Sequence, residues 1–318
     1  MTDATGPESE ATPTPPCQHT LKSAISCTGI GLHSGARISI TLAPGPVDGG
    51  VVFRRVDIPG GGRRVQARWD NVDDTFMCTR VADDSVSVAT VEHLMAALAG
   101  CGIDNAVIEV NGPEVPVMDG SAAPFVFLIE CAGIVPQDAP RRAIEVIKPV
   151  HVSDGDRHAT LAPGSGLVVD FAFDIGRDGL PGQSLNGFGL TRSAFKREIS
   201  RARTFGFLED AKQLRAAGLA LGASLDNAVV IDDGRVLNDG GLRHPDEFVR
   251  HKVLDAVGDL YMAGAPVNGH LSAVGSGHGL NNRLLHALFA DPEAWQWTDA
   301  GAPPQSADTA PAPLAATA

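Results

Sequence analysis

The segment TLAPG occurs twice in this chain, at residues 41–45 and again at 160–164. The stretches that lead into it have the alternation of apolar and polar residues that is typical of half-buried strands. Each half then continues with strands and with a helical segment that carries a histidine, His93 in the first and His251 in the second. The repeat therefore predicts two related halves, and we expect their histidine-bearing helices to meet at the interface between them.

The chain of 318 residues is longer than one typical domain. Short strand patterns with separate helices indicate the α+β class, with two similar domains that each contain a β-sheet packed with helices plus an insert. We place these domains at residues 17–138 and 139–298, with the second insert near 173–190 and the active site at the domain interface. Residues 1–16 are acidic and rich in proline, which predicts a disordered extension. Residues 299–318, rich in alanine and proline, predict a flexible tail.

The bulk composition excludes several classes of protein. A formal net charge of −13 argues against a nucleic-acid-binding protein, which needs a basic face. No apolar run approaches the ~20 residues of a membrane span, and the N-terminus lacks the features of a signal peptide. Five scattered cysteines without a CxxC pair argue against both a disulfide framework and a thiolate zinc site. We therefore expect a cytoplasmic protein without stable membrane insertion. A monomer is expected as well, although none of these features bears on the oligomeric state.

The stretch VRHKVLDAVGD, residues 249–259, has the pattern of a helix. Its His251, Asp255 and Asp259 are spaced by four and fall on one side of that helix. Such a stripe could be a solvated face, although Phe248 falls inside it. The alternative is a metal site, because His and Asp at positions i and i+4 can reach one ion.

Three further stretches contain side chains suited to catalysis. In TVEHLMAAL, Glu92 is adjacent to His93, which would suit a general base beside a metal ligand. In AVGSGHGLNN, His278 lies among glycines and could act as a general acid. In RARTFGF, Thr204 could donate its hydroxyl to an oxyanion. Taken singly, each stretch is also compatible with a structural role.

Together these stretches resemble one family, the zinc-dependent UDP-3-O-acyl-N-acetylglucosamine deacetylases of Gram-negative bacteria, which catalyse the committed step of lipid A synthesis. The resemblance spans residues 19 to about 290. Its segments occur in order: TLKSAISCTGIGLHSG, MCT, TVEHLMAALAGCGIDNAVIEVNGPEVPVMDGSAAPF, SRARTFGF, VLNDGGLRHPDEFVRHKVLDAVGDL and SGHGLNN. The resemblance implies two similar α+β domains and hydrolysis of the N-acetyl group of an acylated UDP-sugar, giving acetate and the free amine.

The resemblance also implies a role for each matching residue. One zinc ion per chain would be bound by His93, His251 and Asp255, and iron(II) suits the same ligand set. The catalytic residues would be the general base Glu92, the general acid His278, its orienting partner Asp259 and the oxyanion donor Thr204. The substrate would contact Lys252, Cys78 and Phe205. The apolar passage for the acyl chain would include Leu208, Ala211, Leu219 and Ala220.

Two departures from the family pattern concern the substrate. The segment DIGRDGLPGQ replaces a His-Pro turn that helps to contact the sugar, and Gly222-Ala223 replaces a pair of glycines near the acyl passage. Two other functions remain open at this point. One is a non-catalytic sugar-nucleotide-binding protein, which would have no need of both Glu92 and His278. The other is a zinc amidase with a different substrate, which the altered turn would favour.

Overall fold

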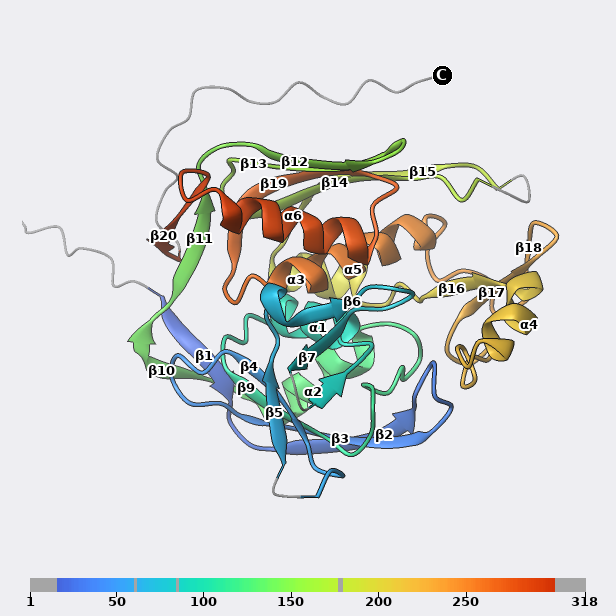
Figure 1. Ribbon diagram of the computed structural model, residues 1–318, viewed down its shortest axis with the longest axis horizontal. Coiled ribbons are helices and arrows are strands. Elements are labelled where there is room, and N and C mark those ends of the chain that lie inside the picture. Colours follow the sequence, from blue (N-terminus) through green and yellow to red (C-terminus); the bar gives the residue numbers. More distant parts are fainter. Residues whose placement is uncertain (1–15, 60–61, 84–85, 177–179, 301–318) are drawn as a thin grey trace, which may run out of the picture.

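The computed structural model describes residues 16–59, 62–83, 86–176 and 180–300. Two large sheets form the outer layers, and the helices α1, α2, α5 and α6 lie between them (Figure 1). The chain is therefore an α+β protein, as the sequence predicted. The extension predicted at 1–16 lies outside the described residues except for Pro16, and so does the predicted tail from residue 301 onward. Asp299 falls within the predicted tail, but it is the last residue of a strand, so the tail prediction is wrong at this residue.

The first half is built on a five-stranded sheet. Its strands follow the order β2-β3-β9-β4-β5 across the sheet. Their bounds are β2 (Ile25–Ile30), β3 (Arg37–Pro44), β9 (Ala106–Val110), β4 (Val51–Arg55) and β5 (Arg63–Gln66). Helix α1 (Glu92–Cys101) precedes β9 and helix α2 (Ala123–Ala132) follows it. Of these elements, β3 and α1 coincide with the strand pattern before TLAPG and with the histidine-bearing helix that the sequence predicted.

The second half repeats this arrangement. The strands β12-β13-β19-β14-β15 lie side by side in the same order and with the same parallel and antiparallel neighbours as those of the first sheet. Their bounds are β12 (Val150–Asp154), β13 (Arg157–Ala162), β19 (Val267–Val274), β14 (Leu167–Phe173) and β15 (Gln183–Gly189). Helix α5 (Glu247–Tyr261) precedes β19, and α6 (His278–Ala290) follows it. The two halves thus share one topology.

The repeated TLAPG segment has the same structural position in both halves. It ends β3 in one sheet and β13 in the other, where the last glycine passes close to the backbone of the neighbouring strand. A Cβ at Gly45 would lie 2.6 Å from the amide nitrogen of Ala106, and a Cβ at Gly164 would lie 2.9 Å from the carbonyl carbon of Gly269. Glycine is required at both positions because a side chain would push the strands apart.

Each half carries an insert between its fourth strand in chain order (β5 or β15) and the helix that precedes its fifth strand (α1 or α5). In the first half this insert holds a 3-10 helix, η1 (Trp69–Asn71), and the small sheet β6 (Val72–Asp74), β7 (Arg80–Asp83) and β8 (Val86–Val88). In the second half it holds α3 (Arg192–Ala194), the π-helical turn η2 (Phe195–Ile199), α4 (Leu208–Ala216) and the sheet β16 (Phe205–Phe207), β17 (Val229–Asp232) and β18 (Arg235–Val236). The second insert was expected near 173–190, and that prediction is wrong: the described part of that range ends β14 and forms β15, which pair within the main sheet.

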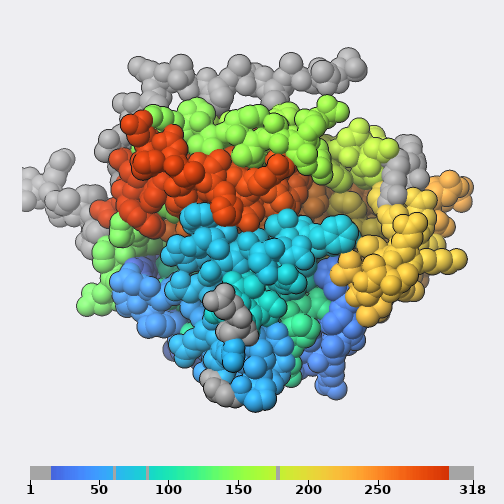
Figure 2. Space-filling view, in the orientation of Figure 1, coloured from blue at the N-terminus to red at the C-terminus, as the bar shows by residue number. Residues whose placement is uncertain are grey.

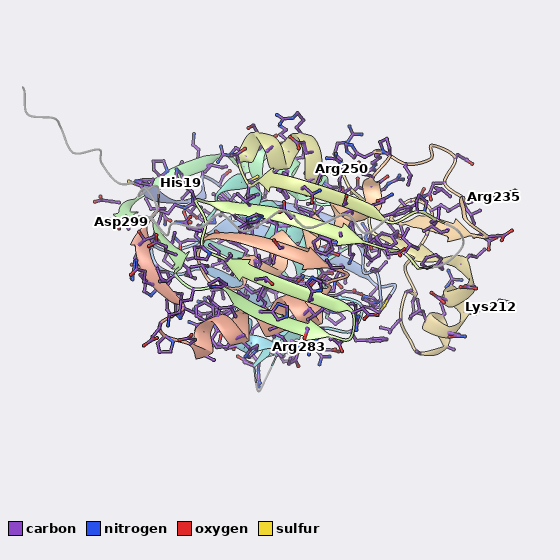
Figure 3. All side chains as sticks on the ribbon, turned by 90° about the horizontal axis from the view of Figure 1, so that it is seen from above. His19, Lys212, Arg235, Arg250, Arg283 and Asp299 are labelled. Atoms are coloured by element: carbon purple, nitrogen blue, oxygen red, sulfur yellow. The ribbon has the colours of Figure 1, made fainter. Side chains whose placement is uncertain are left out.

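The remaining strands join the halves at one end of the molecule. Strand β1 (Cys17–Leu21) pairs with β10 (Ile134–Pro140), so the predicted domain boundary is itself a strand attached to the first half. Strands β11 (Arg142–Val146) and β20 (Trp295–Asp299) extend the second sheet. Figure 3 shows His19 and Asp299 at this end, and Lys212 and Arg235 of the second insert at the opposite end.

The interface between the halves is a buried apolar core. One apolar cluster includes Ile40 of β3, Leu98 of α1, Val253 of α5 and Leu161 of β13, which are all at most 1% exposed. Helices α1 and α5 approach each other closely at Gly258, where a Cβ would lie 2.1 Å from the carbonyl oxygen of Glu92. Burial on every side explains why His251, Asp255 and Asp259 are 2–3% exposed, so the solvated-face interpretation of this helix is wrong. Within the described residues, no helix is long and apolar enough to span a membrane.

Candidate functional site

Three potential metal ligands meet where α1 packs against α5. His93 comes from the first turn of α1, and His251 and Asp255 come from consecutive turns of α5. One ligand atom from each lies within 4.8 Å of the other two. Asp255 Oδ1 is 3.6 Å from His93 Nε2 and 3.4 Å from His251 Nε2. The spacing of four residues in α5 and the close helix contact at α1 thus bring together the triplet that the sequence predicted.

The hydrogen bonds around this triplet fit a bound cation. The carbonyl of Ala202 lies 3.0 Å from His251 Nδ1, which must therefore donate, leaving the lone pair of Nε2 toward Asp255. The Lys252 ammonium donates to Asp255 Oδ2 at 2.6 Å. Asp255 Oδ1 is buried without any hydrogen-bond partner. A buried carboxylate oxygen without a donor is costly, and a cation at this position would remove that cost.

The ionisation of His251 and Asp255 also suits metal binding. Burial, with further contributions from the neighbouring His93 and Lys252, lowers the pKa of His251 to about 3, so its imidazole is neutral near pH 7. Burial by itself would raise the pKa of the Asp255 carboxyl, but the neighbouring His251 and Lys252 hold it well below its usual range. A neutral imidazole and an ionised carboxylate are the forms in which these side chains bind metals.

Glu92 precedes the first histidine and is 3% exposed. The backbone N–H of Thr79 donates to its Oε2 at 2.9 Å. Burial raises the pKa of the Glu92 carboxyl, although the nearby His278 and His93 oppose the shift. A carboxylate with a raised pKa next to a potential metal ligand is well placed to accept a proton.

A second polar cluster adjoins the triplet and is centred on Asp259, one turn further along α5. Its Oδ2 lies 2.9 Å from His278 Nδ1 and accepts from Asn281 Nδ2 at 2.8 Å, while Oδ1 accepts from Thr79 Oγ1 at 2.6 Å. Burial would lower the pKa of His278, but Asp259 overcomes it and raises that pKa to about 9. Because Nδ1 donates to Asp259, the other nitrogen of a protonated His278 is the one that can release a proton.

Thr204 lies in the second insert, directly before β16. Its backbone N–H donates to the carbonyl of Gly120 at 2.8 Å. Just before it, Arg203 forms a buried ion pair with Glu247 at 2.8 Å, which fixes this segment to the start of α5. The adjacent Phe205 ring packs against Phe248 and lies 6.1 Å from the His251 ring. The segment that carries Thr204 therefore borders the triplet.

The other predicted substrate-binding residues fall into two groups. Cys78 is buried next to Thr79, and burial together with Glu92 raises the pKa of its thiol to about 12, so it stays a neutral thiol. The predicted acyl-passage residues lie in or just after α4, a helix without a single buried residue. Of these, Leu208 is 45% exposed. Their part in binding an acyl chain stays a prediction.

Sequence reasoning missed four contributors to this site. Thr79 bridges Glu92 and Asp259, Asn281 supports Asp259, and Gly258 permits the helix contact. The carbonyl of Ala202, which orients His251, carries no side-chain signal at all. Thr79 and Asn281 lie within the quoted MCT and SGHGLNN stretches, so their positions beside the predicted residues could have indicated them.

Comparisons with known proteins agree on one family. The model of the family described as LpxC, UDP-3-O-acyl N-acetylglycosamine deacetylase, matches residues 18–290. The UDP-3-O-acyl-N-acetylglucosamine deacetylase of Acidithiobacillus ferrooxidans is 52% identical over 284 residues, 89% of this chain and 93% of the relative. The deacetylases of the same name from Idiomarina loihiensis and Stenotrophomonas maltophilia strain K279a are 52% and 49% identical, and cover 88% and 90% of this chain and 92% and 94% of their own.

These similarities place the protein among the deacetylases, enzymes that remove an acetyl group by hydrolysis. Within that class, the chain belongs to the UDP-3-O-acyl N-acetylglycosamine deacetylase family.

Proposed function

We propose that this protein hydrolyses the N-acetyl group of UDP-3-O-acyl-N-acetylglucosamine, giving acetate and UDP-3-O-acyl-glucosamine, in the committed step of lipid A biosynthesis. The observation that carries the proposal is the pair of adjoining clusters on α5. A buried His–His–Asp triplet lies beside Glu92, and a His278–Asp259 pair follows one turn later. Three relatives whose sequences are 49–52% identical to this chain are named for this substrate, which supports its assignment here.

We propose that His93, His251 and Asp255 hold one zinc ion. The orphaned Oδ1 of Asp255, the neutral His251 and the two-nitrogen, one-oxygen donor set all fit that ion. When bound, zinc supplies Lewis acidity that polarises an amide carbonyl and acidifies the attacking water. Lys252 holds the outer oxygen of Asp255 and thereby directs Oδ1 toward the two imidazoles.

The side chains divide the proton transfers between two ends of the site. Glu92 accepts a proton from the attacking water, for which its raised pKa suits it. His278 donates a proton to the departing amine, because Asp259 favours its protonated form. Thr204 donates its hydroxyl to the oxygen that gains negative charge. Asp259 stays a positioning residue, held by Thr79 and Asn281.

Release of acetate from UDP-3-O-acyl-N-acetylglucosamine tests this proposal. We expect turnover by the wild-type protein and a loss of about 10²–10⁴-fold for Glu92→Gln and for His278→Gln, the usual contribution of general acid–base catalysis. Binding of the substrate without acetate release by the wild type would instead support a non-catalytic sugar-nucleotide-binding protein. Turnover of other acetylated amides but not of this one would indicate a different substrate.

A further inference from the structure

A cavity of about 480 Å³ lies at the end of the molecule where β20 and the C-terminal end of α5 meet the first half. Its lining contains all three tryptophans of the chain, Trp69, Trp295 and Trp297, and its only tyrosine, Tyr261. The volume is in the range of small-molecule sites. The described residues of the proposed catalytic site do not line it.

The aromatic side chains form one continuous wall that crosses the two halves. Trp69 of the first insert stacks on Phe289 of α6 with ring centroids 4.9 Å apart. Phe289 and Trp297 each pack edge-on against Trp295, at 5.0 and 5.8 Å. In Figure 2 the red C-terminal segments rest directly on the blue and cyan first half. Trp297 is 44% exposed, so this wall is not sealed into the core and presents part of one indole ring to solvent.

The charges around the cavity leave one cation available. Arg142 lies over the Trp297 ring, 4.3 Å from its centroid, and no acidic partner is found for it among the described residues. Among the other charged groups, Asp104 accepts from Arg141 and Arg68 pairs with Asp70, while the Asp48 carboxylate accepts from the neutral amide of Gln18. A guanidinium that lies against an aromatic ring and has no carboxylate partner among the described residues favours a ligand with a negative group.

We propose that this cavity is a second ligand site, which binds a small anion bearing a flat aromatic ring, of the mononucleotide class. The ring would pack against the aromatic wall, and the phosphate would pair with Arg142, whose guanidinium lies over the Trp297 ring. The site is separate from the metal triplet, but it contacts the C-terminal end of α5. The backbone N–H of Trp69 donates to the carbonyl of Met262, which caps that helix.

Tryptophan fluorescence of the full-length, metal-loaded protein tests this site directly, because every tryptophan lies in it. Adenosine 5′-monophosphate is the probe, since it is not part of the proposed substrate. We expect a saturable change in fluorescence with a Kd below about 1 mM, and at least about tenfold weaker binding of adenosine alone and of inorganic phosphate alone. No saturable change would overturn the proposal. Tighter binding of benzoate than of the nucleotide would overturn the assignment to a phosphate.

Two variants separate ligand binding from packing. Arg142→Met keeps the apolar stem of the side chain, and we expect it to weaken nucleotide binding about tenfold. Arg64→Met, on exposed β5 outside the cavity lining, is the matched control and should bind as the wild type does. Trp297→Leu should abolish binding while Trp69 and Trp295 still report, and Phe127→Leu, an exposed aromatic residue on α2, should not. Equal binding by Arg142→Met and Arg64→Met would contradict the proposal.

Discussion

Asp259 contacts His278 through a 2.9 Å hydrogen bond and, through its other oxygen, accepts the hydroxyl of Thr79 at 2.6 Å. Thr79 in turn donates its backbone N–H to Glu92. The proposed acid and the proposed base are therefore linked by one residue from the loop before β7. A change at either end of this series of hydrogen bonds should affect proton transfer rather than metal binding.

The pH dependence of turnover should reveal the first of these links. Asp259 raises the pKa of His278 to about 9, and a general acid must be protonated. Activity should therefore hold below that pH and fall as the pH rises through about 9. Asp259→Asn removes the charge that raises the pKa, so its alkaline limb should move to lower pH. An unchanged alkaline limb in the kcat/KM profile of this variant would separate His278 from the acid role.

Glu92→Gln keeps the size of the side chain and removes its basicity. We expect kcat to fall by about 10²–10⁴-fold while bound zinc stays near one per chain, measured by atomic absorption on the same sample. His93→Gln serves as the comparison because it removes a proposed ligand and should lose the metal. Loss of metal from Glu92→Gln would show that Glu92 is a ligand rather than the base.

Lys252→Met tests whether the lysine acts on the metal or only on the substrate. Its ammonium holds Asp255 Oδ2, and removing a group that orients a ligand typically costs 10–100-fold in metal affinity. Competition with a fluorescent zinc chelator measures this directly. A variant with wild-type zinc affinity and a raised KM would assign Lys252 to the substrate alone.

Gly258→Ala should separate the two helices that build the site. The new Cβ would lie 2.1 Å from the Glu92 carbonyl oxygen, and overpacking of this kind costs about 1–3 kcal/mol. We expect a lower Tm and weaker zinc binding. Gly240→Ala, whose Cβ would meet nothing within 4 Å, is the control and should match the wild type. Equal Tm values for the two variants would mean that the α1–α5 contact is not rigid.

The sequence predicted the repeated halves because TLAPG marks an equivalent strand end in each half. Its final glycine is required at both positions because the backbone of the neighbouring strand passes close to it. It predicted His93, His251 and Asp255 mainly through resemblance, because the helical wheel alone could not distinguish a buried polar stripe from a solvated one. That distinction depends on α1, which covers the stripe from a distant part of the chain. The position of the second insert and the role of Ala202 depend on backbone pairing that leaves no local pattern, and both were missed.

Zinc titration of the metal-free protein tests the central claim most directly. Acetate release from UDP-3-O-acyl-N-acetylglucosamine should be negligible after chelation and should rise in proportion to added zinc up to one equivalent per chain. His251→Gln under the same conditions should stay inactive. Full acetate release by metal-free protein, or none after one equivalent of zinc, would contradict a zinc-dependent deacetylase.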